Sequence, residues 1–364
     1  MKTSRRDTLR DPVTPRVSVV IVDRDRRIYL REALDSVLAQ DVDERLMEVI
    51  VAKGYEDAEL EGHLNAVGAR HVTLCDVPLG KLWVAAARIA RGEIIAFLDD
   101  DDLFHPTKIG RVLSTFEAHP GLTYYHNSSL RVDEHCRILD KQIALPTETQ
   151  YIQSEAATSD EIMSLYMENP MSSSFLCIDR IVLERYADFL SEAGFVIDHV
   201  ALALSLATGG GLFFDSKVLT YYRVHGGSTT HSPGTGSQVD SKSAYFYSNG
   251  TWTFGRLVGF LEATSKEELP LFFVRALYCT FSAKAQIVSS RNQSDWTVLR
   301  GLAGLAVRYR HPEFVSLAFL YFLHLLFPRF SARLFQALRR THLTAQSPHL
   351  SDHGSAGSAR NLSV

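Results

Sequence analysis

Short apolar runs and amphipathic segments alternate along the first hundred residues of the chain. Residues 16–22 form an apolar, β-branched run, and residues 28–40 place their apolar side chains at helical spacing. The alternation continues and predicts strands at 47–52, 71–75 and 93–98, with helices at 58–67 and 80–90. This order predicts an α/β fold with an open, mostly parallel sheet flanked by helices.

The pattern is mixed over the next hundred residues. It predicts a strand and turn at 122–132, strands at 172–178 and 217–224, and a helix at 199–211 that ends at glycines. Residues 225–237 are rich in Gly, Ser and Thr and show no periodicity. Such composition predicts a mobile loop, which we expect to close over a ligand.

From residue 243 to about residue 340 almost the whole pattern is compatible with helices, and it contains no further strand signals. Residues 314–328 contain no Asp, Glu, Lys or Arg, and arginines flank them on both sides. Because a helix needs about 20 apolar residues to cross a bilayer, this stretch favours a helix lying in the membrane interface, with arginines at anionic headgroups. The alternative is a buried helix in a soluble helical appendage.

These patterns divide the chain into four parts. We expect a flexible N-terminus at 1–15, an α/β domain at 16–243, a helical membrane-interface region at 244–342 and a disordered tail at 343–364.

Composition narrows the function classes. The chain is 46% hydrophobic with a formal net charge of -4, which gives no case for nucleic acid as a partner. Its four cysteines show no CxxC spacing and are expected to be reduced, structural thiols. The basic N-terminus lacks an apolar segment, so we expect no signal peptide and a cytoplasmic setting.

Four consecutive aspartates, Asp99 to Asp102, follow the strand predicted at 93–98. In open α/β sheets ligands bind beyond the carboxyl ends of the strands, so this run should face the ligand crevice. Carboxylates at such an edge suit Mg²⁺ or Mn²⁺, which would hold a diphosphate. The alternative is a solvated acidic loop.

Two further residues carry possible chemistry. His225 follows a predicted strand and precedes Gly-Gly. An imidazole at this position could contact a ligand, or it could have a purely structural role. Asp198 precedes the apolar residues of a predicted helix. An aspartate there is either an ordinary N-cap or, near the crevice, a general base.

The order and flanks of these features resemble the family 2 glycosyltransferases. The segments that carry the resemblance are "VSVVI", "LREALDSVLAQ", "MEVIVA", "GEIIAFLDDDDLFHP" and "YYRVHGGS", within about residues 16–231. The details look most like archaeal, membrane-associated members. The resemblance implies an inverting enzyme of the GT-A fold at 16–243 that uses nucleotide-diphosphate sugars.

The resemblance also implies roles for individual residues. Asp198 matches the catalytic base, and Asp101 and His225 match the site of Mn²⁺ or Mg²⁺. Asp102 would shape the aspartate loop. The residues implied in donor binding are Asp23, Lys53, Lys81, Asp99 and Asp100.

The chain departs from the family pattern at two places. Many relatives carry an aspartate pair after the second strand, where this chain has Lys53 and Gly54. Since a lysine cannot accept a hydrogen bond from a nucleobase, the sequence does not choose between a UDP- and a GDP-sugar. The acidic pair that usually precedes the catalytic helix is reduced to Asp198 in "VID".

The function implied is hexosyl transfer to a hydroxyl of a glycan linked to a polyprenyl or dolichyl lipid, at the cytoplasmic face of the membrane. One alternative is a sugar-nucleotide nucleotidyltransferase, although the first strand is followed by "VDRDRRIYL" and not by a Gly-rich phosphate loop. A second is an inactive binding protein that has kept the fold.

Overall fold

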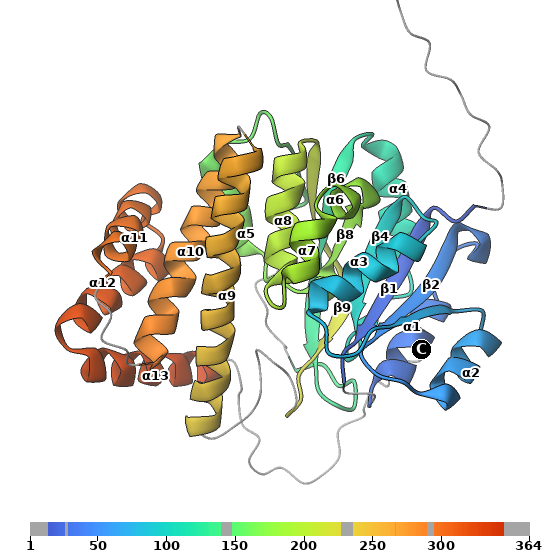
Figure 1. Cartoon of the computed structure of the whole chain (residues 1–364), viewed down its shortest axis with the longest axis horizontal. Helices are drawn as coiled ribbons and strands as arrows, with labels where there is room; N and C mark the ends of the chain where they lie inside the picture. Colours follow the sequence, from blue (N-terminus) through green and yellow to red (C-terminus); the bar gives the residue numbers. More distant parts are fainter. Residues whose placement is uncertain are drawn as a thin grey trace, which may run out of the picture.

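The computed structural model describes residues 14–25, 28–139, 148–226, 236–265, 267–289 and 295–345 (Figure 1). Most of the predicted N-terminal segment 1–15, the tail 343–364 and the loop 225–237 lie outside these residues.

The first half of the α/β domain is the parallel sheet that the sequence predicts. Strands β1 (Val17–Asp23), β2 (Met47–Lys53), β3 (Arg70–Thr73) and β4 (Ile94–Asp99) pair in parallel in the order β3-β2-β1-β4. Helices α1 (Leu30–Leu38), α2 (Ala58–Ala66) and α3 (Leu79–Ile89) connect them. All seven residues of β1 are buried, which explains its unbroken apolar run.

The second half makes the sheet mixed. It contributes β5 (Leu103–Phe104), β6 (Leu122–Val132), β7 (Gln150–Gln153), β8 (Leu176–Asp179) and β9 (Gly211–Arg223). The order is β3-β2-β1-β4-β8-β6-β9-β5, with β7 on β9, and β8 runs antiparallel to both of its neighbours. The prediction of a mostly parallel sheet therefore holds for the first half only. The sequence could not show the direction of the later strands, because a buried strand is equally apolar whether it runs parallel or antiparallel to its neighbours.

Helices cover both faces of this sheet. One core unites the sheet with α1, α2 and α4 (Lys108–Ala118). The other unites it with α3, α5 (Ser159–Glu168), α6 (Arg180–Arg185), α7 (Ala187–Glu192) and α8 (Ile197–Thr208) (Figure 1). The helix predicted at 199–211 is α8; it ends at Gly209, whose positive φ of 79° suits glycine, and Gly211 already belongs to β9.

The C-terminal region is helical, as predicted. It comprises α9 (Gly236–Thr264), α10 (Glu268–Ser289), α11 (Trp296–Tyr309), α12 (Pro312–Leu326) and α13 (Pro328–Ala345). Phe254 of α9 and Phe273 and Phe281 of α10 belong to the core that also contains α8. The helical region therefore packs directly on the α/β domain.

Candidate active site

The aspartate run forms a tight loop at the carboxyl end of β4. It is bounded by β5, which pairs with β9 through Leu103 and Tyr221. Asp100, Asp101 and Asp102 are only 1%, 7% and 0% exposed. This burial rules out a solvated acidic loop.

Arg223, the last residue of β9, fixes this loop in place. Its backbone N–H donates to Asp102 Oδ1 at 2.8 Å, and its Nε donates to the carbonyl oxygen of Asp101 at 2.8 Å. The guanidinium also pairs with Glu32 at 2.7 Å and lies over the Tyr29 ring at 4.3 Å. A fully buried cation thus anchors the loop from beneath.

Asp102 is the most deeply buried carboxyl of the loop. Burial, reinforced by the charges of Asp101 and Asp99, raises the pKa of Asp102 well above its usual range. The loop therefore carries less negative charge than four carboxyl groups suggest.

A buried lysine supports the loop from α4. Lys108 Nζ donates to the Ser174 carbonyl oxygen at 2.6 Å and to Thr220 Oγ1 at 3.0 Å, while Ser174 Oγ accepts the backbone N–H of Asp99. Burial lowers the pKa of Lys108 to about 8. Strand β9, the 3₁₀ turn Ser173–Phe175 and α4 thus meet under the aspartates.

Asp101 and His225 are brought together from positions 124 residues apart. His225 follows β9 by two residues, and its Nε2 lies 3.0 Å from Asp101 Oδ2. Two neighbouring ligands at about 2.1 Å from an octahedral Mg²⁺ or Mn²⁺ lie about 3.0 Å apart, so the pair fits such an ion. Within the described residues no group of three or more His, Cys, Asp or Glu side chains forms a metal site, so the pair would leave most positions to water and phosphate.

Asp198 lies at the same edge of the sheet. Strand β9 runs parallel to β6, which is antiparallel to β8, as is β4; β9 and β4 therefore run in the same direction. Helix α8 ends three residues before β9 begins, and its 12 residues span about 18 Å in the opposite direction. Its first turn, with Asp198, is thereby carried to the edge where β4 ends.

The residue before α8 has an unusual backbone. Val196 has a φ of 52° and a ψ of 32°, the left-handed region that a β-branched side chain rarely occupies. Such strain at the entry to a helix is typical of functional sites.

His199 holds the Asp198 carboxylate. Its Nδ1 lies 2.7 Å from Asp198 Oδ1, and its backbone N–H donates to the same oxygen at 2.9 Å. Burial raises the pKa of Asp198, but the charge of His199 and these hydrogen bonds outweigh it, so the pKa lies below its usual range. Asp198 is therefore ionised at neutral pH. The His199 ring meets Tyr166, Phe254 and Phe281 edge-on, and the last two belong to the C-terminal helices.

Asp23 and Lys53 are register partners at the carboxyl ends of β1 and β2. Asp23 Oδ2 accepts a hydrogen bond from the Tyr55 hydroxyl. Lys53 is fully buried, and its ammonium donates to Glu61 at 2.6 Å and to the Tyr55 carbonyl oxygen at 2.8 Å. Lys53 thus supports the loop after β2, and contact with a donor stays a prediction for both residues.

Lys81 is exposed in the first turn of α3, which follows β3 at the same edge of the sheet. Its side chain is accessible to an anionic ligand, and its role in donor binding also stays a prediction.

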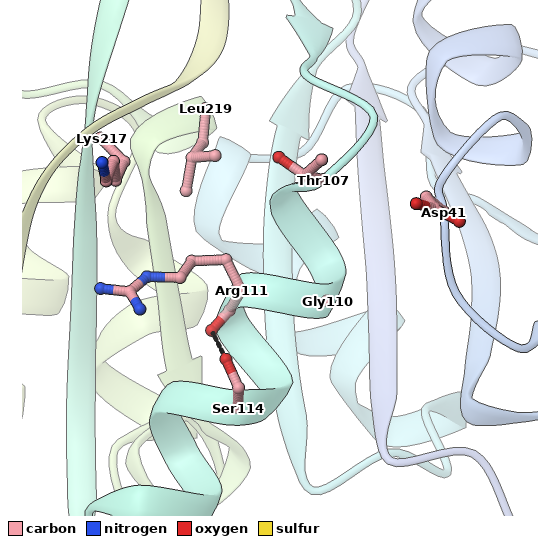
Figure 2. A pocket seen from close by; sticks show the side chains of 7 residues that line it. All are labelled: Asp41, Thr107, Gly110, Arg111, Ser114, Lys217 and Leu219. Carbon is pink, nitrogen blue, oxygen red and sulfur yellow. Dashed lines mark hydrogen bonds between the residues drawn. The ribbon is translucent and has the colours of Figure 1, made fainter.

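A separate surface depression lies beside α4. Figure 2 shows Arg111 and Lys217 on one side of it and Asp41 on the other. Arg111 is already paired with Asp215 at 2.7 Å. None of the predicted site residues lines this depression, so we do not place the reaction there.

Several residues of the site were not predicted. Arg223 stood inside the "YYRVHGGS" segment, but no feature of the sequence indicates that its guanidinium turns under a loop more than 100 residues away. Ser174 and Lys108 have ordinary sequence contexts, and only the folded chain brings them to the aspartate loop. His199 directly follows Asp198, but its sequence context does not indicate that its ring holds that carboxylate.

Comparisons with known proteins concern the sequence family and the fold. The profile described as "Glycosyl transferase family 2" matches residues 18–129, which include the aspartate loop but neither Asp198 nor His225. No curated protein matches significantly.

Solved structures match over most of the chain. The crystal structure of S. aureus TarS 1-349 has a TM-score of 0.53 at 13% identity, covering 91% of this chain and 92% of that one. Its complex with UDP-GlcNAc gives 0.54 at 14% identity with the same coverage. A Pyrobaculum calidifontis mannosyltransferase in complex with GDP-Man and Mn²⁺ gives 0.46 at 14% identity, covering 91% and 89%.

The TarS likeness concerns the fold, and the profile match concerns the sequence of the parallel half and the aspartate loop. Both findings agree with the α/β fold of this domain. Residues 18–129 thus match glycosyl transferase family 2 in sequence, and the chain as a whole shares the fold of the TarS structures.

Proposed function

We propose that the chain is an inverting, metal-dependent hexosyltransferase that moves a sugar from a UDP- or GDP-sugar to a hydroxyl of a lipid-linked glycan. The observation that carries the proposal is the 3.0 Å approach of Asp101 and His225 at the edge that also holds Asp198. This edge of the sheet thus holds a candidate cation site and a separate ionised carboxylate. An inverting sugar transfer needs both: a cation for the departing diphosphate and a base for the acceptor hydroxyl.

The chemistry follows from the two parts. A Mg²⁺ or Mn²⁺ ion held by Asp101 and His225 would neutralise the charge of the departing nucleoside diphosphate. Asp198 accepts the proton of the acceptor hydroxyl as its oxygen bonds to the anomeric carbon. The bond from that carbon to the diphosphate oxygen breaks on the opposite face, so one displacement inverts the configuration.

Donor and location are narrower proposals. The solved TarS complex contains UDP-GlcNAc, which places UDP-sugars first among the donors to be tested. The apolar and arginine-rich C-terminal helices support an acceptor held by a membrane, and we place the enzyme at its cytoplasmic face.

The test is a panel of UDP-, GDP- and dTDP-sugars with Mn²⁺, Mg²⁺ or chelator, in the presence of membrane lipids. We expect nucleoside diphosphate release with one donor and its loss with chelator. Asp198→Asn should lower kcat about 10²- to 10⁴-fold, the usual contribution of a positioned base. Asp101→Asn should weaken Mn²⁺ binding, measured by calorimetry.

Asp188→Asn, at an exposed position of α7, is the matched control and should leave both quantities unchanged. Release of pyrophosphate from a nucleoside triphosphate would instead indicate a nucleotidyltransferase. Metal binding without turnover of any donor would indicate an inactive relative.

A further inference from the structure

We propose that the outer face of α12 and the start of α13 docks on an anionic membrane surface. This surface, called the docking face below, consists of Val315, Phe319, Phe322, Leu326, Phe327, Arg329, Phe330 and Arg333. This docking rests on the proposed function, because binding to a membrane would bring the enzyme to a lipid-linked acceptor. The test below measures lipid binding independently of sugar transfer.

The apolar part of the docking face is a helical stripe. Val315, Phe319, Phe322 and Leu326 are spaced by four, three and four residues, so they share one face of α12. They are 49%, 58%, 43% and 51% exposed, and Phe327 and Phe330 continue the stripe at 61% and 57%. Soluble proteins rarely leave such a contiguous set of large apolar side chains in water.

The packing of α12 fixes which face points outward. Phe314, Leu317 and Tyr321 on its other face are buried. Leu317 and Tyr321 pack with Ile287 of α10 and Leu302 of α11, and the Tyr321 hydroxyl donates to Gln286 at 2.7 Å. The exposed stripe is therefore a second apolar face of α12, outside the core that its other face joins.

The charge around the stripe selects the partner. Arg329 and Arg333 are exposed at its end, and residues 314–345 contain no Asp or Glu. At its other end Glu313 is paired with Lys284 at 2.7 Å. An apolar stripe with a cationic end complements the acyl region and anionic headgroups of a bilayer. A symmetric contact with a second copy would instead bring arginine toward arginine.

The lengths of the helices favour lying on the membrane over crossing it. The 15 residues of α12 span about 22 Å, less than the roughly 30 Å of a bilayer core. Among the described helices α10 is the one that is long and apolar enough to cross, but 56% of its apolar window is buried within the protein.

The backbone of α13 and the carboxyl ends of two strands of the sheet lie toward one side of the view in Figure 1. There α13 runs along the lower edge, and the carboxyl ends of β1 and β9 point to that edge.

The experiment is flotation of the full chain with vesicles of phosphatidylcholine, alone or mixed with phosphatidylglycerol. We expect binding to the mixed vesicles that weakens with salt. Phe319→Asp with Phe322→Asp should lower the bound fraction at least tenfold, and Arg329→Glu with Arg333→Glu should remove the preference for phosphatidylglycerol. The control, Ile181→Asp with Trp252→Asp, places the same charges at exposed apolar positions of α6 and α9 and should bind as the unmodified chain does.

All substituted side chains are exposed, so unchanged circular dichroism and melting temperatures will verify folding. The proposal is overturned if the full chain does not float, or if both face variants float like the control. It is also overturned if light scattering shows a dimer that only the Phe319 and Phe322 variant loses. Vesicle binding without sugar transfer would refute the proposed function alone, and transfer without vesicle binding would refute the docking face alone.

Discussion

Asp198 and His199 show how one neighbour sets the ionisation of a buried carboxylate. Burial raises the pKa of Asp198, but the electrostatic effect of His199 and the hydrogen bonds from its ring and its backbone N–H to one oxygen lower it by more, so the pKa lies below its usual range. His199 is thus a positioning residue for the proposed base.

Replacing His199 by Phe should retain the packing against Phe254 and Phe281 and remove the side-chain hydrogen bond. We expect kcat to fall on the order of tenfold, a part of the roughly 10²- to 10⁴-fold that a positioned base contributes. Because the pKa of Asp198 then rises, the acid limb of the kcat–pH profile should move to higher pH. His199→Asn, whose amide can donate near the position of Nδ1, should restore part of the rate. An unmoved acid limb in His199→Phe would contradict this role.

His126 of β6 is a residue whose titration affects folding. Burial lowers its pKa to about 4, from an ordinary value of 6.5. Between these values the unfolded chain binds more protons, so stability is present above pH 6.5 and is lost as the pH falls toward 4. The full shift corresponds to about 3 kcal/mol.

His126→Gln should remove this dependence, since glutamine does not titrate and can still donate to the Pro170 carbonyl oxygen as Nε2 can. Urea unfolding at several pH values between 7 and 4 measures it: the loss of stability should be smaller in the variant by up to about 3 kcal/mol. Equal losses in both chains would show that His126 is protonated in the folded state.

At the scale of elements, the site depends on close backbone packing between α3 and α7. Gly80 in the first turn of α3 donates its N–H to the Ala193 carbonyl oxygen at 2.8 Å. A Cβ there would lie 1.8 Å from the carbonyl oxygen of Leu190. The chain runs from α7 through Val196 into α8. The contact at Gly80 therefore helps to position the first turn of α8, which carries Asp198.

Gly80→Ala should therefore destabilise the chain by more than about 2 kcal/mol, in the range of overpacked positions. Gly62→Ala is the matched control, because Gly62 is exposed in α2 and its Cβ would have no atom within 4 Å. It should stabilise the chain by up to about 1 kcal/mol, through helix propensity. Chemical denaturation measures both, and equal effects of the two substitutions would contradict the packing described here.

For the whole molecule, the α/β domain and the C-terminal helices share one core. Phe254 and Phe281 belong to the same cluster as α8, and they cover the ring of His199. Loss of the helices would therefore affect both stability and the position of the base, even without a membrane.

A chain that ends at residue 243 should accordingly fail to fold into a soluble monomer. A chain that ends at residue 345 retains every described helix and should match the full chain in melting temperature. Size-exclusion chromatography and calorimetry distinguish the two. A folded, active chain of residues 1–243 would show that the helices are a separable appendage.

The sequence by itself determined the elements whose signals are local. Apolar periodicity predicted the first four strands and the C-terminal helices, because the burial of each element is visible along its own residues. It also indicated the carboxyl edge of β4 as the place of the aspartates. Strand direction beyond β4 was not predictable, since pairing partners lie far apart in the chain.

Tertiary structure decided how the site is held together. It placed Arg223 under the aspartate loop and Asp101 beside His225, and it enclosed the ring of His199 with aromatic side chains from α5, α9 and α10. It also left one apolar face of α12 outside the core, which composition alone could not distinguish from a buried helix. These outcomes depend on long-range packing, where the partners of a side chain are set by the whole fold and not by its neighbours in sequence.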